Sequence, residues 1–392
     1  MDIFKKCREY TDAKAVMAKG IYPYFLPLTE NEGTEVVYEG KRIIMCGSNN
    51  YLGLTTHPKV KEAAIKAIER FGTSCTGSRF LNGTLELHEQ LEKELADFVG
   101  KEEALVFSTG MQTNLGTISS LMTRDDVVIL DKEDHASIVD GARLGYGKIE
   151  RFRHNDIEHL ERVLKSIPEN NGKLVVVDGV FSMGGDLADL PQILPLVKKY
   201  GARIMVDDAH GMGVTGGGKG TAHEFGMDDD VDLIMSTFSK SFASLWGFIA
   251  GDSDVVHYIK HTARALIFSA SIPASNAASV LEAIKVIRAE PERVDRVNAI
   301  GETIRTELRR MGFNIGDSVT PIVPVIIGDD TLTFMTWKAL FENGVFVNPV
   351  VSPAVPAGQQ LLRTSYMATQ TDEQIDKVLQ VFEKVGKDLA II

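Results

Sequence analysis

Lys240 is the residue of this chain whose type and place most strongly indicate chemistry. It lies in the segment TFSKSF, shortly after the apolar run VDLIM (231–235), which predicts a buried strand. Lysine is rarely buried without a partner. A neutral lysine amine, however, can form a Schiff base with an aldehyde. We therefore expect Lys240 to react rather than to serve only the fold.

Four other apolar runs also end in polar segments. FSTGMQTN contains Gly110 and Met111, DKEDHASIVDG contains His135, DGVFSMGGD contains Ser182, and VDDAHGMG contains Asp207 and His210. A single Asp or His at such a place is often only a turn or helix-cap residue. Because open α/β sheets bind ligands at the carboxyl ends of their strands, five such ends together predict one site.

Pyridoxal phosphate (PLP) is the cofactor that fits these residue types. Lys240 would hold its aldehyde, and Asp207 would place a carboxylate at its ring nitrogen. His210 would reach its phenolic oxygen, and His135 would stack on its ring. The expected phosphate donors are Thr237, Ser239 and the helix start at Gly110 and Met111.

Three other kinds of site match less well. GMGVTG (211–216) fits a dinucleotide-binding pattern, but no convincing helix opens at its glycines. GVTGGGKG (213–220) nearly fits a Walker A loop, but Gly220 stands where Ser or Thr must bind magnesium. A zinc site from Asp207, His210 and His135 has no H-E-x-x-H or CxxC motif to support it. We expect a flexible glycine-rich loop and no metal.

Short apolar runs alternate with longer amphipathic segments along most of the chain. The runs are ALVF (104–107), VVIL (127–130), KLVVVDG (173–179), ARIMVDD (202–208), VDLIMS (231–236) and FIAG (248–251). They predict an α/β fold whose large domain has a mostly parallel sheet flanked by helices. We expect an N-terminal arm with a small sheet over 1–55, a catalytic domain over 56–290 and a smaller α+β C-terminal domain over 291–392.

The composition argues against several classes of protein. A net charge of −12 disfavours nucleic acid as a partner. The sequence has no run of 18 apolar residues and no apolar secretory segment at its start, so we expect no transmembrane segment. The three cysteines, Cys7, Cys46 and Cys75, are widely spaced and suit reduced thiols in the cytoplasm.

Eight segments together resemble the α-oxoamine synthase family, whose members have the type I fold of PLP-dependent transferases. They are SNNYLGL, GSRFLNGT, FSTGMQTN, DHASIVDG, VDGVFSM, VDDAHGMG, TFSKSF and LLRTSYMAT, which follow the family's order from residue 48 to 369. GSRFLNGT (77–84) is most similar to the branch that uses L-serine and a long-chain acyl-CoA. The resemblance therefore implies decarboxylative condensation of L-serine with palmitoyl-CoA. The products would be 3-ketodihydrosphingosine, CoA and carbon dioxide, in the first step of sphingolipid biosynthesis.

The same resemblance implies roles for further residues. Lys240 would take the Cα proton and Arg363 would bind the substrate carboxylate, with Asn50, Ser78 and His135 as further substrate contacts. Ser269 and Ala270 resemble the segment that reaches the partner subunit's phosphate, which implies a homodimer with active sites at the subunit interface. Peripheral membrane contact would be compatible with this function.

Two questions stay open at this stage. Rival functions are a family member of the glycine C-acetyltransferase or 8-amino-7-oxononanoate synthase type, an aminotransferase, and a catalytically silent regulatory subunit. The presence of Lys240 and Asp207 argues against the last of these. The family usually has two small residues where this chain has Trp246 and Gly247. The indole would either reshape the substrate pocket, turn to solvent, or pack in the core or at a subunit interface.

Overall fold

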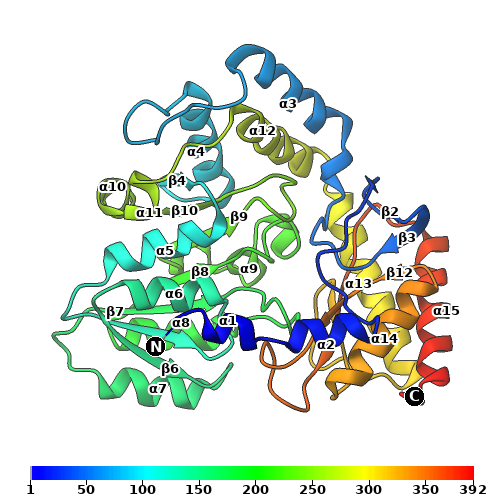
Figure 1. The fold of residues 1–392 in the computed structure, drawn as a ribbon. Helices are drawn as coiled ribbons and strands as arrows, with labels where there is room; N and C mark the ends of the chain where they lie inside the picture. The colour runs from blue at the N-terminus through cyan, green and yellow to red at the C-terminus, as the bar shows by residue number, and fades with distance from the viewer. Residues whose placement is uncertain (1) are drawn as a thin grey trace.

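A seven-stranded sheet forms the centre of the computed structural model, which describes residues 2–392 (Figure 1). Its order is β4-β10-β9-β8-β7-β5-β6, and every pair is parallel except the two made by β10. The strands are β4 (Glu103–Phe107), β5 (Val127–Asp131), β6 (Lys148–Phe152), β7 (Lys173–Asp178), β8 (Arg203–Asp207), β9 (Leu233–Thr237) and β10 (Gly247–Gly251). The expected mostly parallel α/β sheet is confirmed. Only β6 is missing from the expected strands, because KIERF at the sheet edge mixes charged and apolar residues.

The register of the sheet brings several strand ends to the same level. Asp207 in β8 pairs with Asp178 in β7 and with Met235 in β9. Asp131 pairs with Phe152 at the ends of β5 and β6. The polar segments that follow these parallel strands therefore leave from one edge of the sheet, where α/β proteins bind ligands.

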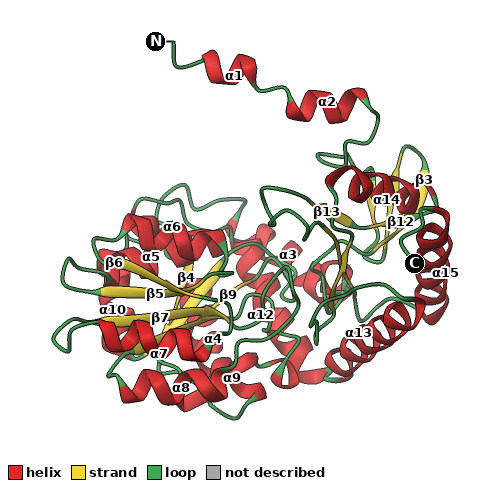
Figure 2. Ribbon diagram, turned by 90° about the horizontal axis from the view of Figure 1, so that it is seen from below, coloured by secondary structure: helices red, strands yellow, loops and turns green. Residues whose placement is uncertain are grey.

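Helices cover both faces of the central sheet (Figure 2). α5 and α6 lie over one face, and α7 and α8 lie over the other. The helices of this part are α3 (Pro58–Phe71), α4 (Glu86–Val99), α5 (Gly110–Leu121), α6 (Ala136–Leu144), α7 (Ile157–Ser166), α8 (Leu190–Lys199), α9 (Thr221–Glu224), α10 (Ser253–Thr262), α11 (Arg264–Ile267) and α12 (Ala274–Ala289), with short 3-10 turns at Leu54–Thr56, Gly216–Gly218 and Asp228–Asp230.

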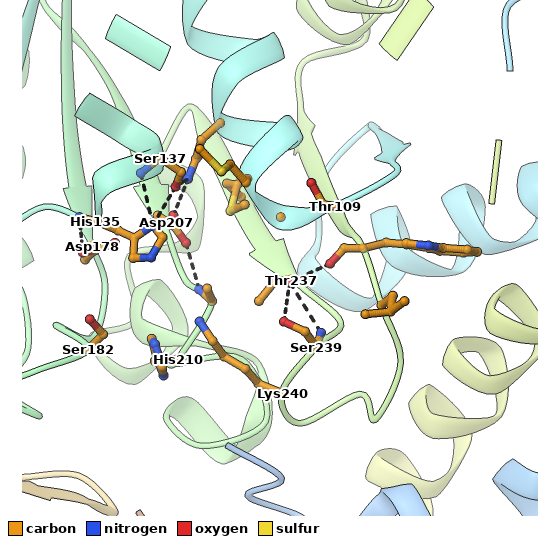
Figure 3. A pocket seen from close by; sticks show the side chains of 17 residues that line it. Thr109, His135, Ser137, Asp178, Ser182, Asp207, His210, Thr237, Ser239 and Lys240 are labelled. Carbon is orange, nitrogen blue, oxygen red and sulfur yellow. Dashed lines mark hydrogen bonds between the residues drawn. The ribbon is translucent and has the colours of Figure 1, made fainter. Parts of the chain in front are cut away.

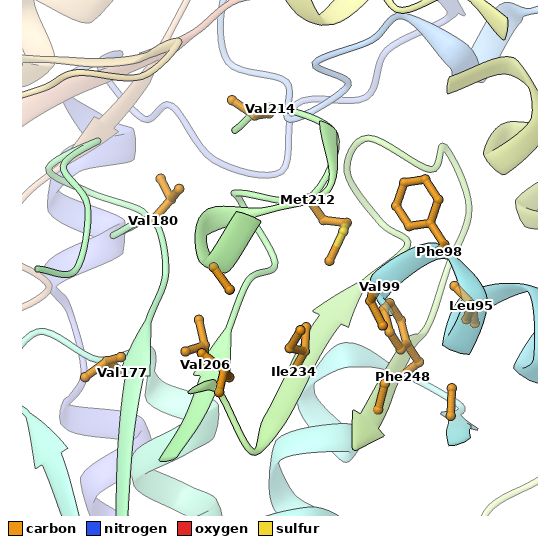
Figure 4. Close-up of a cluster of buried hydrophobic side chains, with 14 of the residues drawn as sticks. Leu95, Phe98, Val99, Val177, Val180, Val206, Met212, Val214, Ile234 and Phe248 are labelled. Carbon is orange, nitrogen blue, oxygen red and sulfur yellow. The ribbon is translucent and has the colours of Figure 1, made fainter. Parts of the chain in front are cut away.

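Side chains on the two faces of the sheet belong to two hydrophobic clusters. Val177, Val206, Ile234 and Phe248, from four strands, meet Phe98 of α4 in one cluster (Figure 4). Residues that alternate with them along the strands belong to a cluster on the other face. Because both faces are buried, the inner strands are continuous apolar runs, which made them visible in the sequence.

A smaller part of the protein combines both ends of the chain. Its helices are α13 (Glu292–Met311), α14 (Asp330–Glu342) and α15 (Asp372–Asp388). One sheet has the order β11 (Ile322–Ile326), β14 (Leu361–Ser365), β13 (Asn348–Val350), and the other has the order β1 (Glu30–Asn31), β2 (Glu35–Tyr38), β3 (Lys41–Met45), β12 (Val345–Phe346). In the second sheet Val345 pairs with Ile44, so C-terminal residues complete the N-terminal sheet. The division of the chain near residues 55 and 290 stays a prediction.

Two short helices precede these elements. α1 (Lys5–Glu9) and α2 (Asp12–Ala18) contain no buried residue. Figure 2 shows them extending away from the rest of the protein. Within residues 2–392, no helix combines the length and the apolar character needed to cross a membrane.

Candidate active site

A pocket of about 330 Å³ lies at the carboxyl ends of β7, β8 and β9 (Figure 3). Its wall contains the candidates Gly110, Met111, His135, Ser182, Asp207, His210, Thr237, Ser239 and Lys240. The other lining residues are Thr109, Asn114, Ser137, Asp178, Ala209, Met235, Leu245 and Trp246. The fold thus brings five separate segments of the chain together at the edge where the sequence predicts a site.

Lys240 points into this pocket toward Asp207 (Figure 3). Within residues 2–392 its amine has neither a hydrogen bond nor an ion pair. Burial lowers the pKa of this amine to about 8, although the negative charges of Asp207 and Asp178 oppose the shift. Near pH 8 a large fraction of the amine is therefore neutral, and nucleophilic attack requires the neutral form.

Asp207 is buried, and two donors hold its carboxylate. Asn114 Nδ2 donates to Oδ2 over 2.7 Å, and the backbone N–H of Ala209 donates to Oδ1 over 3.1 Å. The amide of Asn114 also donates to Ser137 Oγ over 2.8 Å. The α5 helix therefore orients the carboxylate at the end of β8.

His135 caps α6 and lies close to Asp207 (Figure 3). Its Nδ1 lies 2.7 Å from Ser137 Oγ and accepts from the Ser137 N–H over 3.3 Å. Burial lowers the pKa of His135, and the Lys240 charge adds to this while the Asp207 charge opposes it. His135 therefore has both a capping role and a neutral ring at the pocket.

A buried tyrosine supports His210. Tyr51 Oη lies 2.7 Å from His210 Nδ1, and the two rings meet edge to face. Burial lowers the pKa of His210 well below its usual value, and the positive charges of Lys240 and Arg363 lower it further. His210 is thus a neutral imidazole with one nitrogen engaged by Tyr51.

Gly110 lets the first turn of α5 approach the end of β9. A Cβ at Gly110 would lie 2.8 Å from Thr237 Oγ1 and 2.9 Å from Thr237 Cβ, which is closer than van der Waals contact allows. The first N–H groups of a helix have no partner within the helix and favour anions. The Thr237 hydroxyl donates to the Trp246 carbonyl over 2.6 Å, so its hydrogen is engaged. Ser239 beside it is exposed.

Arg363, from β14 in the smaller part, does not line the pocket wall, but its positive charge acts on Lys240 and His210. Its Nε donates to the Ser182 carbonyl over 2.6 Å. Its Nη2 is buried and has no hydrogen-bond partner in the described residues 2–392. Leaving a charged nitrogen buried and unpaired is costly. This nitrogen therefore marks a place where an anionic group would be stabilised.

Asn50 and Ser78 lie outside the pocket wall. Asn50 is bonded within its own loop, because its Nδ2 donates to Thr55 Oγ1 over 2.8 Å. Ser78 Oγ is buried and has no partner within residues 2–392. Neither side chain contributes to the pocket within this single chain.

Ser269 and Ala270 also lie outside the pocket wall, but beside the start of α5. Ser269 Oγ accepts from Gln112 Nε2 over 2.7 Å. The Ala270 carbonyl accepts from Ser108 Oγ over 2.6 Å. The segment is therefore fixed to the helix whose first turn faces the pocket.

Sequence reasoning missed Asn114 and Asp178, although both lie in segments it singled out. Asn114 lies four residues after Gly110, on the same face of α5. Asp178 ends β7, and its Oδ2 accepts from the His135 N–H over 2.9 Å. Burial and the neighbouring Asp207 charge raise the pKa of Asp178 well above its usual value. Helical spacing and a strand-end position were the signals that could have found them.

The Trp246 indole packs in the main core. Trp246 is only 4% exposed and belongs to the same cluster as Phe98 and Phe242. The interpretation that the ring turns to solvent is therefore wrong. Its φ of +104° is a conformation that favours glycine and strains a bulky residue.

The glycine-rich segment 211–220 packs closely around Asp208. A Cβ at Gly211 would lie 1.9 Å from Asp208 Oδ1, and a Cβ at Gly220 would lie 2.0 Å from Asp208 Oδ2. Most of the segment is buried. Its glycines therefore serve close packing, in place of the flexible loop expected from the sequence.

The chemistry of the lining residues fits PLP. A partly neutral amine faces a fixed carboxylate, as an aldehyde cofactor with a basic ring nitrogen requires. Gly110 and Met111 line the pocket at the start of α5, where the first N–H groups of a helix favour an anion such as a phosphate group. Both features come from residues that line one pocket.

Comparison with known proteins agrees with this geometry. The family model for aminotransferase class I and II matches residues 41–382. Serine palmitoyltransferase of Bacteroides thetaiotaomicron is 49% identical over 99% of both chains. The 8-amino-7-oxononanoate synthase of Alkaliphilus metalliredigens is 40% identical over 94% of both chains. The structure of S. paucimobilis serine palmitoyltransferase with bound PLP–myriocin is 37% identical, covers 100% of both chains and has a TM-score of 0.97. This chain belongs to the aminotransferase class I and II family and, within it, to the α-oxoamine synthases.

Proposed function

We propose that this protein is a PLP-dependent acyltransferase that condenses L-serine with palmitoyl-CoA. Carbon dioxide and CoA leave, and 3-ketodihydrosphingosine is the product. The observation that carries this proposal is the partly neutral Lys240 amine, which faces the fixed Asp207 carboxylate across the pocket. Full-length similarity to serine palmitoyltransferases supports the choice of serine and a long acyl chain.

The residues around Lys240 divide the work of the first half-reaction. Bound PLP supplies an electron sink that stabilises negative charge at the Cα of the amino acid. Asp207, held by Asn114, keeps a proton on the ring nitrogen. Lys240 would hold the cofactor through Nζ until the amine of serine displaces it, and the freed Nζ would then remove the Cα proton, which its lowered pKa permits.

The Arg363 guanidinium binds the carboxylate of L-serine. Its Nε is anchored on the Ser182 carbonyl, and its unpaired Nη2 remains to bind an anion. The planar guanidinium matches a carboxylate with two parallel hydrogen bonds. His135 would stack on the cofactor ring and orient the bound serine, while His210 would reach the phenolic oxygen. Asn50 and Ser78 are assigned to the substrates on the family resemblance alone.

The first turn of α5 would bind the phosphate through the N–H groups of Gly110 and Met111, together with Ser239, and Thr237 would join them by turning its hydroxyl away from the Trp246 carbonyl. We assign Ser269 and Ala270 to the phosphate site of a second copy, so the working form is a homodimer. The neighbouring Phe268 is 75% exposed, an apolar surface that a second copy would cover. Light scattering should give twice the chain mass, and a monomer that is fully active would contradict this assignment.

We place the protein in the cytoplasm, in peripheral contact with membrane where it meets its acyl-CoA. The free thiols of Cys7, Cys46 and Cys75 suit a reducing compartment. Cell fractionation tests this placement, because a periplasmic or integral membrane fraction would contradict it.

An amino-acid titration of the PLP-loaded protein tests the proposed reaction. L-Serine should change the visible spectrum at lower concentration than glycine or L-alanine. Subsequent palmitoyl-CoA should release CoA and carbon dioxide in equal amounts. A preference for glycine or alanine, or transfer of the amino group to a keto acid without CoA, would contradict the proposal.

A further inference from the structure

His154 lies outside the pocket wall, between two carboxylates from different segments. It follows β6, and its Nδ1 lies 3.0 Å from Asp131 Oδ1 while its Nε2 lies 2.8 Å from Asp186 Oδ2. Both ring nitrogens can donate only when the imidazole is protonated. Burial disfavours that charge, but the hydrogen bonds that the ring donates to the two carboxylates, together with their negative charges, outweigh burial and raise the pKa of His154 to about 10. The proposed reaction uses none of these three side chains.

Asp186 belongs to a tight turn, residues 180–187, that follows β7. A bridge between Val180 and Leu187 closes the turn, and the Phe181 N–H donates to the Asp186 carbonyl over 3.0 Å. The His154 ring also packs edge to face on Phe181, with centroids 4.4 Å apart. His154 therefore holds the turn at both a charged and an aromatic contact.

The other side of this turn supports Arg363. Ser182, the residue after Phe181, lines the pocket, and its carbonyl accepts from Arg363 Nε over 2.6 Å. The turn also meets the smaller part through Gly185, whose carbonyl accepts from Thr320 Oγ1 over 2.9 Å. The turn thus lies between His154 and the guanidinium, so a displacement of the turn would move Arg363.

We propose that His154 is a positioning residue for the substrate carboxylate. Its ion pair with Asp186 fixes the turn 180–187, and the turn fixes the Arg363 guanidinium through the Ser182 carbonyl. This inference rests on the proposed function, in which Arg363 binds the carboxylate of L-serine. A residue of this kind sets the affinity for serine without touching serine, PLP or acyl-CoA.

His154→Gln tests this role, because glutamine is uncharged and presents an acceptor oxygen on one side, where the two carboxylates need donors on both sides. We measure the L-serine concentration that half-saturates the visible spectral change of the PLP-loaded, full-length protein. It should rise about tenfold, a size typical of substitutions that act on a binding site from a distance. Bound PLP per chain and the KM for palmitoyl-CoA should stay unchanged.

His159→Gln is the matched control. His159 lies five residues further on, and its Nδ1 accepts from the Arg153 N–H rather than contacting the turn. This variant should bind L-serine as the wild type does. If His154→Gln fails to fold, Asp186→Asn carries the same test, because it removes the carboxylate charge and keeps an acceptor of similar shape.

An Arg363→Lys background shows whether His154 acts through Arg363. Coupled residues have non-additive effects. Adding His154→Gln to Arg363→Lys should therefore weaken serine binding by less than about twofold. Wild-type serine affinity in His154→Gln, or the same tenfold loss in both backgrounds, would overturn the inference and leave the proposed function intact. If Arg363→Lys itself leaves serine binding unchanged, the carboxylate assignment in the proposed function fails, and this inference fails with it.

Discussion

Lys240 and His154 both follow parallel strands at the same edge of the central sheet, but their surroundings shift the two pKa values in opposite directions. Lys240 follows β9 and faces a pocket, where burial lowers its pKa to about 8. His154 follows β6 and lies between Asp131 and Asp186, whose hydrogen bonds overcome burial and raise its pKa to about 10. Acidic residues are near both side chains, so proximity of acids alone does not explain the difference.

The difference lies in whether the carboxylates reach the cation, because the carboxylates at His154 also accept hydrogen bonds from other groups. Asp207 already accepts from Asn114 and Ala209, and Asp178 accepts from the His135 N–H. Neither makes a hydrogen bond to Lys240 within residues 2–392. At His154 each ring nitrogen has its own carboxylate. The reactive Lys240 amine therefore has no hydrogen-bond partner, whereas the His154 ring, which holds the turn 180–187, has two.

Lys240→Ala should have the largest effect on turnover of the substitutions that test this comparison. Turnover should fall about 10⁴-fold or more, because the chain loses both the group that holds the cofactor and its base. At pH 7 the melting temperature of the apoprotein should not fall and should rise somewhat, since the amine has no hydrogen bond to lose and its buried charge is removed. Borohydride treatment of the PLP-loaded wild type should fix the cofactor on the peptide that contains Lys240.

Lys219→Ala is the control for this experiment, because Lys219 is an exposed lysine of a nearby loop. It should keep normal turnover and normal labelling at Lys240. A labelled peptide that contains any other lysine would refute the assignment of Lys240.

Asp207→Asn and Asp208→Asn compare two neighbouring carboxylates with different tasks. Asp207→Asn should bind PLP yet lose roughly 10²–10⁴-fold in turnover, because an amide cannot keep the ring nitrogen protonated. Asp208 instead accepts from the N–H and hydroxyl of Thr221 at 2.6 and 2.7 Å. Asp208→Asn should therefore lower stability by about 1–3 kcal/mol while turnover is kept. Steady-state kinetics and urea unfolding of both variants distinguish the catalytic role of Asp207 from the structural role of Asp208. Near-wild-type turnover in Asp207→Asn would contradict the role of Asp207.

The pH dependence of stability should have opposite signs at His154 and Lys240. For His154 the pKa is about 10 in the folded protein and about 6.5 in the unfolded chain. The folded state therefore binds more protons between these values, so its stabilisation is complete below pH 6.5 and is lost as pH rises through 10. For Lys240 the folded pKa of about 8 lies below the unfolded value of about 10.4. Between these values stability rises with pH.

Urea unfolding of the apoprotein at several pH values measures both contributions. The stability that His154→Gln loses relative to wild type should be largest near pH 6 and should shrink toward pH 10. Lys240→Ala should gain stability relative to wild type at pH 7, and this gain should shrink above pH 8. If both variants were less stable than wild type at pH 7, or both more stable, the contrast between the two sites would be wrong.

Sequence reasoning predicted the reactive site better than the structural one, for physical reasons. Asp207 ends and Lys240 follows a strand buried on both faces, and a polar residue at the end of a continuous apolar run is conspicuous. His154 follows an edge strand with a mixed pattern, so no apolar run draws attention to it. Its partners lie 23 and 32 residues away, and only the register of β5 with β6 and the turn after β7 bring them together.

The alternation of apolar and amphipathic segments predicted the fold class. It did not predict which segments far apart in the sequence lie side by side. The pairing of β12 with β3 depends on two residues in each strand, too few for a periodic signal. Arg363 came from the family resemblance, because a cation within a short strand of the smaller part has no pattern that points to the pocket. Trp246 was visible only as a departure from that family, and its burial had to come from the structure.

Trp246→Gly should have the smallest effect on chemistry and tests the region between the reactive lysine and the core. Removing a buried indole costs about 3–5 kcal/mol. Glycine relieves a strain of about 1–3 kcal/mol at a φ of +104°. We therefore expect a net loss of about 2 kcal/mol in the free energy of unfolding. The relative kcat/KM values for acyl-CoA substrates of different length should stay the same, because the ring packs in the core.

Leu245→Ala is the matched comparison for Trp246→Gly, because Leu245 lines the same pocket but is 60% exposed. Its truncation should change acyl-CoA kinetics more than stability, the reverse of the expected result at Trp246. Melting temperature and kcat/KM across acyl lengths, measured on both variants, separate the two roles. If Trp246→Gly shifts the acyl-length profile at an unchanged melting temperature, the indole shapes the substrate channel.

PLP affinity is a third measurement on Trp246→Gly, because the Thr237 hydroxyl donates to the Trp246 carbonyl. A weaker PLP affinity in Trp246→Gly would show that the strained backbone helps to hold the phosphate side of the pocket.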